Sequence, residues 1–353
     1  MIVVIKPNTT AEQTKDVVDK ITSMGYGVNV SQGAERLIIG VLGVREDKDM
    51  LAAQLRSFEC VDRVVSISRS FKFVSREGTQ AKTVVRVNGD VHIGDSAVHV
   101  IAGPCTVEGR DMLLDTARFV KSRGATMLRG GAYKPSTSPY SFQGMGKEGL
   151  QILAEARADC GLPIVTEVMD PRDVGLVSEF ADVLQIGARN MQNFNLLKEV
   201  AKAHKPVMLK RGLSATVEEW LLAAEYIYAG GNHEVILCER GIRTFETATR
   251  NTLDLSAVPL LALLTHLPVI VDPSHGTGKW ELVTPMACAA IAAGADGIMI
   301  EVHPRPADAL KDGFESLNFE KYAKMMEAVR PIAAAMSRPI ASDSRPAVQV
   351  TSG

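Results

Sequence analysis

The chain has 353 residues, 46% of them hydrophobic and 23% charged, which is enough for one large and one small domain with separate cores. Its 39 Lys and Arg against 41 Asp and Glu give a net charge of −2, so there is no electrostatic reason to expect a nucleic acid or an anionic membrane as partner. No apolar run reaches the length of a bilayer span, and no basic region precedes the short apolar run at the amino terminus, so we expect no signal peptide. The five cysteines are odd in number and lack CxxC spacing, which is typical of the reducing cytoplasm.

Residues 1–70 have the pattern of a small domain. Apolar runs predict strands and helical periodicity predicts helices in the order β-α-β-β-α-β, with strands at 1–6, 26–31, 36–43 and 61–68 and helices at 10–24 and 48–58. This order is that of a ferredoxin-like domain. Domains of this kind often bind effectors, although many only pack against a neighbour, so we expect a regulatory role.

Residues 71–98 predict a linker and a β-hairpin, the hairpin from an Asn-Gly pair at 88–89 between two short strands. From 99 to 336, helical segments alternate with eight short apolar runs of the kind expected for strands buried on both faces: HVIAGPC, TMLRGGAY, PIVTEVM, ADVLQIGAR, PVMLKRG, EVILCERG, LPVIVDPSH and GIMIEVHP. Eight βα units predict an α/β fold with a (β/α)₈ TIM barrel rather than an open doubly wound sheet, since no GxGxxG follows the first strand. Residues 337–353 are rich in Pro and Ser without periodicity and predict a mobile tail.

The stretch IVDPSHGTGKW at 270–280 ends an apolar strand in an acid and an imidazole, and its glycines predict a loop. In a barrel, the carboxyl ends of all the strands meet at one rim, where active sites lie. Four strand-end or loop positions carry metal-binding side chains: Cys105, His275, Glu301 and Asp312. A thiolate, an imidazole and carboxylates together suit a divalent transition metal, with Mn, Fe, Co and Zn all open. Each residue alone is more often structural, so this prediction depends on the barrel.

The same strand ends carry five cations: Arg129, Lys134, Arg189, Lys210 and Arg240. Crowded like charges repel one another unless something anionic lies among them. Ion pairs with Glu167, Glu239 and Glu301 would account for some of these charges but not for their excess. Because guanidinium and ammonium groups are the usual receptors of phosphate and carboxylate, the residues predict a small phosphorylated acid beside a metal.

Several long motifs then stand in order: IAGPC, LRGGAYKPSTSPYSFQG, QIGARNMQNF, LKRG, ILCERGIRTFE, DPSHGTG and IEVHPRP. They closely resemble the 3-deoxy-D-arabino-heptulosonate 7-phosphate (DAHP) synthases of the type I beta subclass, which have a ferredoxin-like regulatory domain ahead of the barrel. The resemblance runs from Met1 to about Met336. It implies the first step of the shikimate pathway, in which phosphoenolpyruvate and erythrose 4-phosphate condense to DAHP and phosphate. It also implies a metal-dependent enzyme that is commonly a homotetramer.

The resemblance also implies roles for individual residues. The metal ligands would be Cys105, His275, Glu301 and Asp312. The phosphoenolpyruvate site would comprise Arg129, Lys134, Gly187, Ala188, Arg189, Lys210 and Arg240, with catalysis by Lys134, Glu167, His275 and Cys105. The aldose phosphate would be held by Pro135, Ser136, Thr137, Ser138 and Asp312. Asp272 would orient its neighbours.

Two departures from the family pattern leave questions open. The family motif KPRTS reads KPSTS here, so Ser136 stands where an arginine would contact the aldose phosphate. In the small domain, Asn29 replaces the histidine of tyrosine-sensing relatives while Ser31 is retained, so tyrosine, phenylalanine or no effector remain open. The alternatives are a 3-deoxy-octulosonate 8-phosphate synthase acting on a longer aldose phosphate, a metal-dependent aldolase without an enolpyruvate site, and an effector-binding protein with an inactive barrel.

Overall fold

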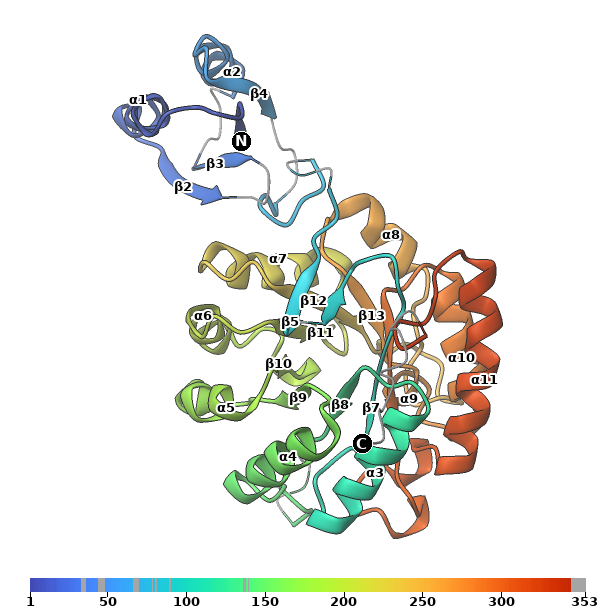
Figure 1. Cartoon of the computed structure of the whole chain (residues 1–353). Helices are drawn as coiled ribbons and strands as arrows, with labels where there is room; N and C mark the ends of the chain where they lie inside the picture. The colour runs from blue at the N-terminus through green and yellow to red at the C-terminus, as the bar shows by residue number, and fades with distance from the viewer. Residues whose placement is uncertain are drawn as a thin grey trace, which may run out of the picture.

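The structure, a computed structural model, describes residues 1–32, 36–43, 48–65, 70–77, 79, 81–88, 90–135, 138 and 140–343. A small four-stranded sheet with two helices stands at the amino-terminal end of the chain, and a closed barrel surrounded by helices follows it (Figure 1). This is the α/β architecture that the sequence predicts.

The small domain consists of β1 (Ile2–Ile5), α1 (Ala11–Ser23), β2 (Gly27–Gln32), β3 (Leu37–Leu42), α2 (Lys48–Arg56) and β4 (Val61–Val65). Its strands pair antiparallel in the order β2-β3-β1-β4, which confirms the ferredoxin-like prediction. Helix α1 begins at a capping box in which Thr10 and Gln13 satisfy each other's backbone N–H groups. Apolar side chains from both helices and one face of the sheet, among them Val3, Ile21 and Leu55, form a separate core.

The barrel strands are β7 (His99–Gly103), β8 (Met127–Arg129), β9 (Ile164–Glu167), β10 (Val183–Ile186), β11 (Val207–Lys210), β12 (Val235–Glu239), β13 (Val269–Val271) and β14 (Gly297–Glu301). Each strand pairs in parallel with the next, and β14 pairs with β7, so the sheet closes on itself. Closure confirms the predicted TIM barrel and excludes an open sheet. The carboxyl ends of all eight strands, where the predicted site residues lie, therefore meet at one rim of the barrel.

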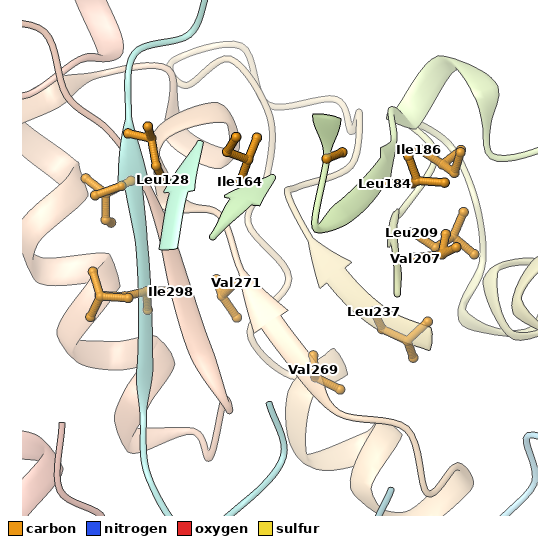
Figure 2. Packing of buried hydrophobic residues seen from close by; sticks show 14 of the residues in the cluster. Leu128, Ile164, Leu184, Ile186, Val207, Leu209, Leu237, Val269, Val271 and Ile298 are labelled. Atoms are coloured by element: carbon orange, nitrogen blue, oxygen red, sulfur yellow. The ribbon is translucent and has the colours of Figure 1, made fainter. Parts of the chain in front are cut away.

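The helices that surround the barrel are α3 (Arg110–Ser122), α4 (Lys147–Cys160), α5 (Val174–Phe180), α6 (Phe194–Lys202), α7 (Val217–Ala229), α8 (Ala257–Leu264), α10 (Trp280–Ala292) and α11 (Phe319–Ala335). The apolar residues on the outer face of the strands pack against them, and Figure 2 labels several of these, including Leu128, Leu209 and Ile298. Burial on both faces explains why these strands read as continuous apolar runs. Within the described ranges, no helix has the length and hydropathy needed to cross a membrane.

A hairpin of β5 (Val85–Asn88) and β6 (Val91–Ile93) closes the amino-terminal end of the barrel. Its four buried side chains join the inward-facing residues of the barrel strands in one apolar cluster. The backbone N–H of Arg86 donates to Glu234, just before β12, at 2.8 Å. Because this end is filled, the opposite rim is the open one. Gly89, in the predicted turn, lies outside the described residues.

The segment predicted as a linker is partly built into the barrel. Phe71 and Val74 belong to the barrel's main core. The Glu225 carboxylate on α7 accepts three successive backbone N–H groups of this segment at 2.9, 2.9 and 3.0 Å. The ring of Phe73 lies so close to Gly40 on β3 that a Cβ there would stand 2.4 Å from it. The segment thus connects the small domain and the barrel through defined contacts.

The first part of the predicted mobile tail packs against the barrel. The N–H of Val98 donates to Pro339 O at 2.8 Å, and the N–H of Ala341 donates to Val98 O at 2.9 Å. Ile340 between them is only 2% exposed. For residues 337–343 the structure therefore differs from the prediction, because lack of periodicity does not reveal pairing with a strand far back in the sequence.

Candidate active site and metal centre

A cavity of about 220 Å³ opens at the carboxyl ends of the barrel strands. Most of the residues predicted from the strand ends line it: Cys105, Arg129, Lys134, Pro135, Glu167, Gly187, Ala188, Arg189, Lys210, Arg240, His275 and Asp312. Glu301, the last residue of β14, is fully buried and contacts His275 and Arg129 of this lining. The barrel therefore places the predicted site residues around one cavity.

Four side chains in this region form a cluster of metal-binding atoms. Cys105 follows β7, His275 follows β13, Glu301 ends β14 and Asp312 lies in the loop beyond, and one ligand atom of each lies within 4.8 Å of the others. The Sγ of Cys105 is 3.1 Å from Oδ2 of Asp312, 207 positions along the chain. The Nε2 of His275 is 3.3 Å from Oε1 of Glu301.

The loop predicted after β13 is instead a one-turn helix, α9 (Pro273–Thr277). Asp272 caps it, since its Oδ1 accepts the His275 backbone N–H at 3.0 Å. Pro273 suits the first helical position because its fixed φ is already helical. The other oxygen, Oδ2, lies 2.7 Å from Nδ1 of His275. Cap and ring contact together fix the direction of the imidazole, in line with the orienting role expected of Asp272.

The arrangement around His275 suits a bound cation. Burial lowers the pKa of His275 to about 4 against the opposing effect of Asp272, so the imidazole is neutral near pH 7. With Nδ1–H directed at Asp272, the lone pair of Nε2 faces Oε1 of Glu301 at 3.3 Å and Oε1 of Glu315 at 3.8 Å. Among the described residues, neither oxygen has a hydrogen-bond donor. Buried acceptors that face one another are unfavourable unless a cation lies between them, so these residues fit a metal ion.

Lys134 stands between the metal-binding cluster and the cavity. Its Nζ lies 2.6 Å from Sγ of Cys105 and 3.2 Å from Oδ2 of Asp312. Burial opposes its charge, but Cys105, Glu301 and Asp312 together raise the pKa of Lys134, so the ammonium is charged. Burial and the Glu301 carboxylate raise the pKa of the Cys105 thiol well above its usual value. A divalent ion would replace the thiol proton, because metals bind the thiolate.

One buried cationic group of the cavity, the guanidinium of Arg129, has N–H groups that lack acceptors among the described residues. Arg129 is 5% exposed, and its Nε and Nη1 have no acceptor among the described residues. Its Nη2 lies 3.1 Å from Oε1 of Glu301, without the alignment of a hydrogen bond. Glu239, one of the acids expected to neutralise the cavity, pairs instead with Arg211 at 2.9 Å. Buried N–H groups without acceptors are costly, so they point to an anionic ligand.

Glu167 reaches the cavity from the end of β9. Its Oε2 accepts a hydrogen bond from Gln185 at 3.2 Å. Burial raises the pKa of this carboxyl, although Lys134 and Lys210 oppose the change. Gly187 makes room for it, because a Cβ there would lie 2.0 Å from Oε1 of Glu167. These contacts explain why a glycine begins the loop after β10.

The predicted aldose phosphate site is only partly described. Ser136 and Thr137 lie outside the described residues, while Pro135 lines the cavity and Ser138 is exposed, its Oγ accepting the Tyr140 N–H at 3.3 Å. Besides Thr166 and Gln185 on the strands, four polar loop residues that were not predicted from the sequence line the cavity: Arg243, Arg250, Asn251 and Lys311. They lie in loops beyond the strand ends. The motif GIRTFE, which contains Arg243, and the position of Lys311 next to Asp312 were the features of the sequence that could have indicated two of them.

The residues singled out in the small domain lie on β2. Asn29 pairs with Gly40 of β3 in the sheet. Ser31 is buried, and its Oγ lies 3.3 Å from Nε2 of His233 in the loop after α7. Ser31 thus contacts the barrel, a relation that the sequence did not indicate.

The fold and the site define a TIM barrel with a mixed sulfur, nitrogen and oxygen metal-binding cluster beside a cationic cavity, and with a ferredoxin-like domain ahead of it. Residues 79–336 match the DAHP synthetase I family, and residues 1–69 match the DAHP synthase ferredoxin-like domain. The chain belongs to the DAHP synthetase I family.

Three relatives show the range of similarity. The phospho-2-dehydro-3-deoxyheptonate aldolase of Thermotoga maritima is 50% identical over 336 residues, which cover 95% of this chain and 98% of that protein. A crystal structure of phospho-2-dehydro-3-deoxyheptonate aldolase (DAHP synthase) from Thermotoga maritima is also similar. The match covers 96% of this chain and 98% of the chain in the crystal structure, with 49% sequence identity and a TM-score of 0.77. The 2-dehydro-3-deoxyphosphooctonate aldolase of Syntrophobacter fumaroxidans is 33% identical over 258 residues, which cover 68% of this chain and 88% of that protein.

Proposed function

We propose that this protein catalyses the condensation of phosphoenolpyruvate with erythrose 4-phosphate to DAHP and inorganic phosphate, the first step of the shikimate pathway. The observation that carries the proposal is the four-donor metal cluster directly beside a cavity lined by buried cations. A small acid with both a phosphate and a carboxylate suits such a cavity. A metal-dependent aldolase without an enolpyruvate substrate would not need these cations. The close similarity to the Thermotoga maritima enzyme supports the same reaction.

The proposed metal ligands are Cys105, His275, Glu301 and Asp312, and the ion would be Mn, Fe, Co or Zn. When bound, the ion supplies a Lewis acid that polarises the aldehyde of the aldose phosphate. The role of the chain is to hold the donors: the cap and ring contact from Asp272 keep Nε2 of His275 pointing at the cluster.

The cations would bind phosphoenolpyruvate and orient it. Nε and Nη1 of Arg129 have no acceptor in the described part of the chain and would donate to its phosphate or carboxylate. Arg189, Lys210 and Arg240 line the same cavity, as do Gly187 and Ala188. Lys134, between cavity and cluster, would hold the end of the molecule nearest the aldehyde. Fixed in this way, C3 attacks the aldehyde carbon, since correct orientation removes most of the entropic barrier. Water then adds to C2, where positive charge has developed, and phosphate leaves by C–O cleavage.

Glu167 is the proposed residue for proton transfer in the cavity. Its raised pKa brings the carboxyl nearer to the range in which it can both hold and release a proton. Its Oε1 lacks a donor among the described residues, so it is available to a water or substrate hydroxyl.

The aldose phosphate would bind at Pro135, Ser136, Thr137, Ser138 and Asp312. Ser136 supplies less charge than the arginine of the family motif. Arg243 and Lys311 line the same cavity and would replace that charge.

The small domain would bind an aromatic amino acid through β2, near Asn29 and Ser31. Inhibition requires the effector to prefer one arrangement of the domains over another, and a coupling of about 1–3 kcal/mol would be sufficient. We further propose a homotetramer in the cytoplasm. The five free cysteines, four of them buried, suit a reducing compartment.

A phosphate-release assay with the metal-reconstituted protein tests the activity. Phosphoenolpyruvate would be supplied with erythrose 4-phosphate or with arabinose 5-phosphate at equal concentrations. We expect release with the four-carbon aldose to exceed release with the five-carbon aldose. The reverse order would favour the octulosonate reaction named for the Syntrophobacter relative, and no release with either would contradict the enzyme assignment.

A further inference from the structure

A third acidic side chain lies against the metal-binding cluster without belonging to the four expected ligands. Glu315 ends the short helix η4 (Gly313–Glu315) and is fully buried. Its Oε2 accepts a hydrogen bond from Arg250 at 2.6 Å. Its Oε1 points to the other side, 3.8 Å from Nε2 of His275, and no described residue donates to it.

The separation between Oε1 and Nε2 fits two donors on one ion. Metal–oxygen and metal–nitrogen bonds of about 2.0–2.2 Å allow two ligands of a common ion to stand up to about 4.3 Å apart. The Glu301 Oε1 atom, an expected ligand, lies 3.3 Å from the same nitrogen. Glu301 and Glu315 thus both lie near Nε2 of His275, Glu301 closer than Glu315, and each brings an oxygen that lacks a hydrogen-bond donor among the described residues.

The contacts of Arg250 explain how this acid is kept in place. Its Nη1 binds Oε2 of Glu315 at 2.6 Å and lies 3.4 Å from Oδ1 of Asp312. One cation therefore holds the outer oxygens of two carboxylates while their inner oxygens are directed toward the cluster. Such support is typical of carboxylates that bind metals.

We propose that Glu315 is a fifth ligand, which adds a third carboxylate to the metal centre of this protein. The inference rests on the proposed function only for the existence of that centre. More oxygen donors and a higher coordination number favour Mn²⁺ over Zn²⁺, because Zn²⁺ sites are commonly four-coordinate with nitrogen and sulfur. Glu315 thus gives this chain a greater preference for Mn²⁺ than the four expected ligands alone would.

Mn²⁺ and Zn²⁺ affinities of the metal-free full-length protein test this, with Mn²⁺ binding followed by electron paramagnetic resonance and Zn²⁺ by competition with a chelating dye. The variants are Glu315→Gln, which removes the charge at constant shape, and Glu315→Leu, which removes the donor. Glu320→Gln is the matched control, since that carboxylate is exposed on α11. We expect Glu315→Gln and Glu315→Leu to weaken Mn²⁺ at least about 10-fold, Zn²⁺ clearly less, and the control to change neither.

Two results would overturn the proposal. One is unchanged Mn²⁺ affinity and an unchanged resonance spectrum in both Glu315 variants; the other is an equal fall for both metals, which is the result of general damage to the fold. Arg250→Met tests whether Glu315 binds the metal itself or only holds Arg250 in place. We expect this variant to retain Mn²⁺ binding better than Glu315→Gln does. An equal loss of Mn²⁺ affinity in both variants would count against Glu315 as a ligand. Wild-type protein that binds neither metal would overturn the whole metal centre, whereas binding without phosphate release would leave Glu315 as a ligand and contradict only the catalytic proposal.

Discussion

The carboxylate of Asp272 holds the imidazole of His275 by its Nδ1, 2.7 Å away, and also contacts the ammonium group of Lys210. Burial would raise the pKa of Asp272, but His275 and Lys210 keep it well below its usual range. The fully buried carboxylate of Asp272 thus connects the metal-binding cluster to the cationic cavity. This connection has separate consequences for metal binding and for substrate binding.

Asp272→Asn should weaken metal binding. The amide keeps the size of the side chain but loses the charge that orients and polarises the ring of His275, so we expect about a 10- to 100-fold fall in metal affinity. Equilibrium dialysis with metal analysis measures it, and Asp308→Asn is the control, since that exposed carboxylate ends the short helix η3 (Pro306–Asp308). Equal affinities in Asp272→Asn and wild type would show that the contact has no effect on the metal.

Arg189→Ala should raise the Michaelis constant for phosphoenolpyruvate and leave metal affinity unchanged. Loss of a charge-assisted contact costs about 1.5–3 kcal/mol, or roughly 10- to 150-fold in binding. Lys210→Ala should affect both quantities, since it also removes the partner of Asp272. Steady-state kinetics and metal titration on the two variants would reveal the difference. An unchanged constant for phosphoenolpyruvate in both would contradict the proposed anion site.

The barrel and the cluster could be predicted from the sequence because strand ends converge in a parallel barrel whatever the lengths of the helices between them. Cys105 and Asp312 are far apart in the chain, yet both follow barrel strands. Glu315, at the end of the short helix η4, and Arg250, in a loop after β12, could not be found in this way, because the course of these segments depends on side-chain contacts. The sequence predicts a loop after β13 in place of the one-turn helix because Gly276 within it and Gly278 at its C-cap outweigh the Asp-Pro start signal.

Acidification should loosen the contact between the small domain and the barrel. Burial lowers the pKa of His233, whose ring stacks on Tyr228 at 4.3 Å and whose Nε2 contacts Ser31. An exposed histidine takes up its proton near pH 6.5, so the packed form binds fewer protons just below that pH and loses stability as the pH falls. The melting temperature should drop less between pH 7.5 and 5.5 in His233→Gln than in wild type. Parallel drops would exclude His233 as a cause.

Removal of the small domain should preserve catalysis only if the cut precedes Phe71. A chain that starts at Ser70 keeps Phe71 and Val74 in the barrel core and keeps the backbone contacts of Glu225. A chain that starts at Ser75 loses these two core side chains, each contributing about 1.5–3 kcal/mol, and also the buried Phe73, so it should melt at a lower temperature.

Effector assays on the chain that starts at Ser70 test the regulatory proposal. The Ser70 form should be active and should no longer respond to tyrosine, phenylalanine, tryptophan or prephenate, whichever of them inhibits the full-length protein. A full-length protein indifferent to all four would leave the small domain with a structural role only.

The most direct test of the account is product formation by Cys105→Ala after metal reconstitution. Wild-type protein should form DAHP and phosphate from phosphoenolpyruvate and erythrose 4-phosphate, and should lose this activity with a chelator and regain it with a divalent metal. The variant lacks the one sulfur donor of the cluster and should lose at least about 100-fold in turnover, as expected when stabilisation of transition-state charge is removed. Turnover above about a tenth of the wild-type rate in Cys105→Ala, or wild-type turnover that survives removal of the metal, would contradict a metal-dependent reaction at this site.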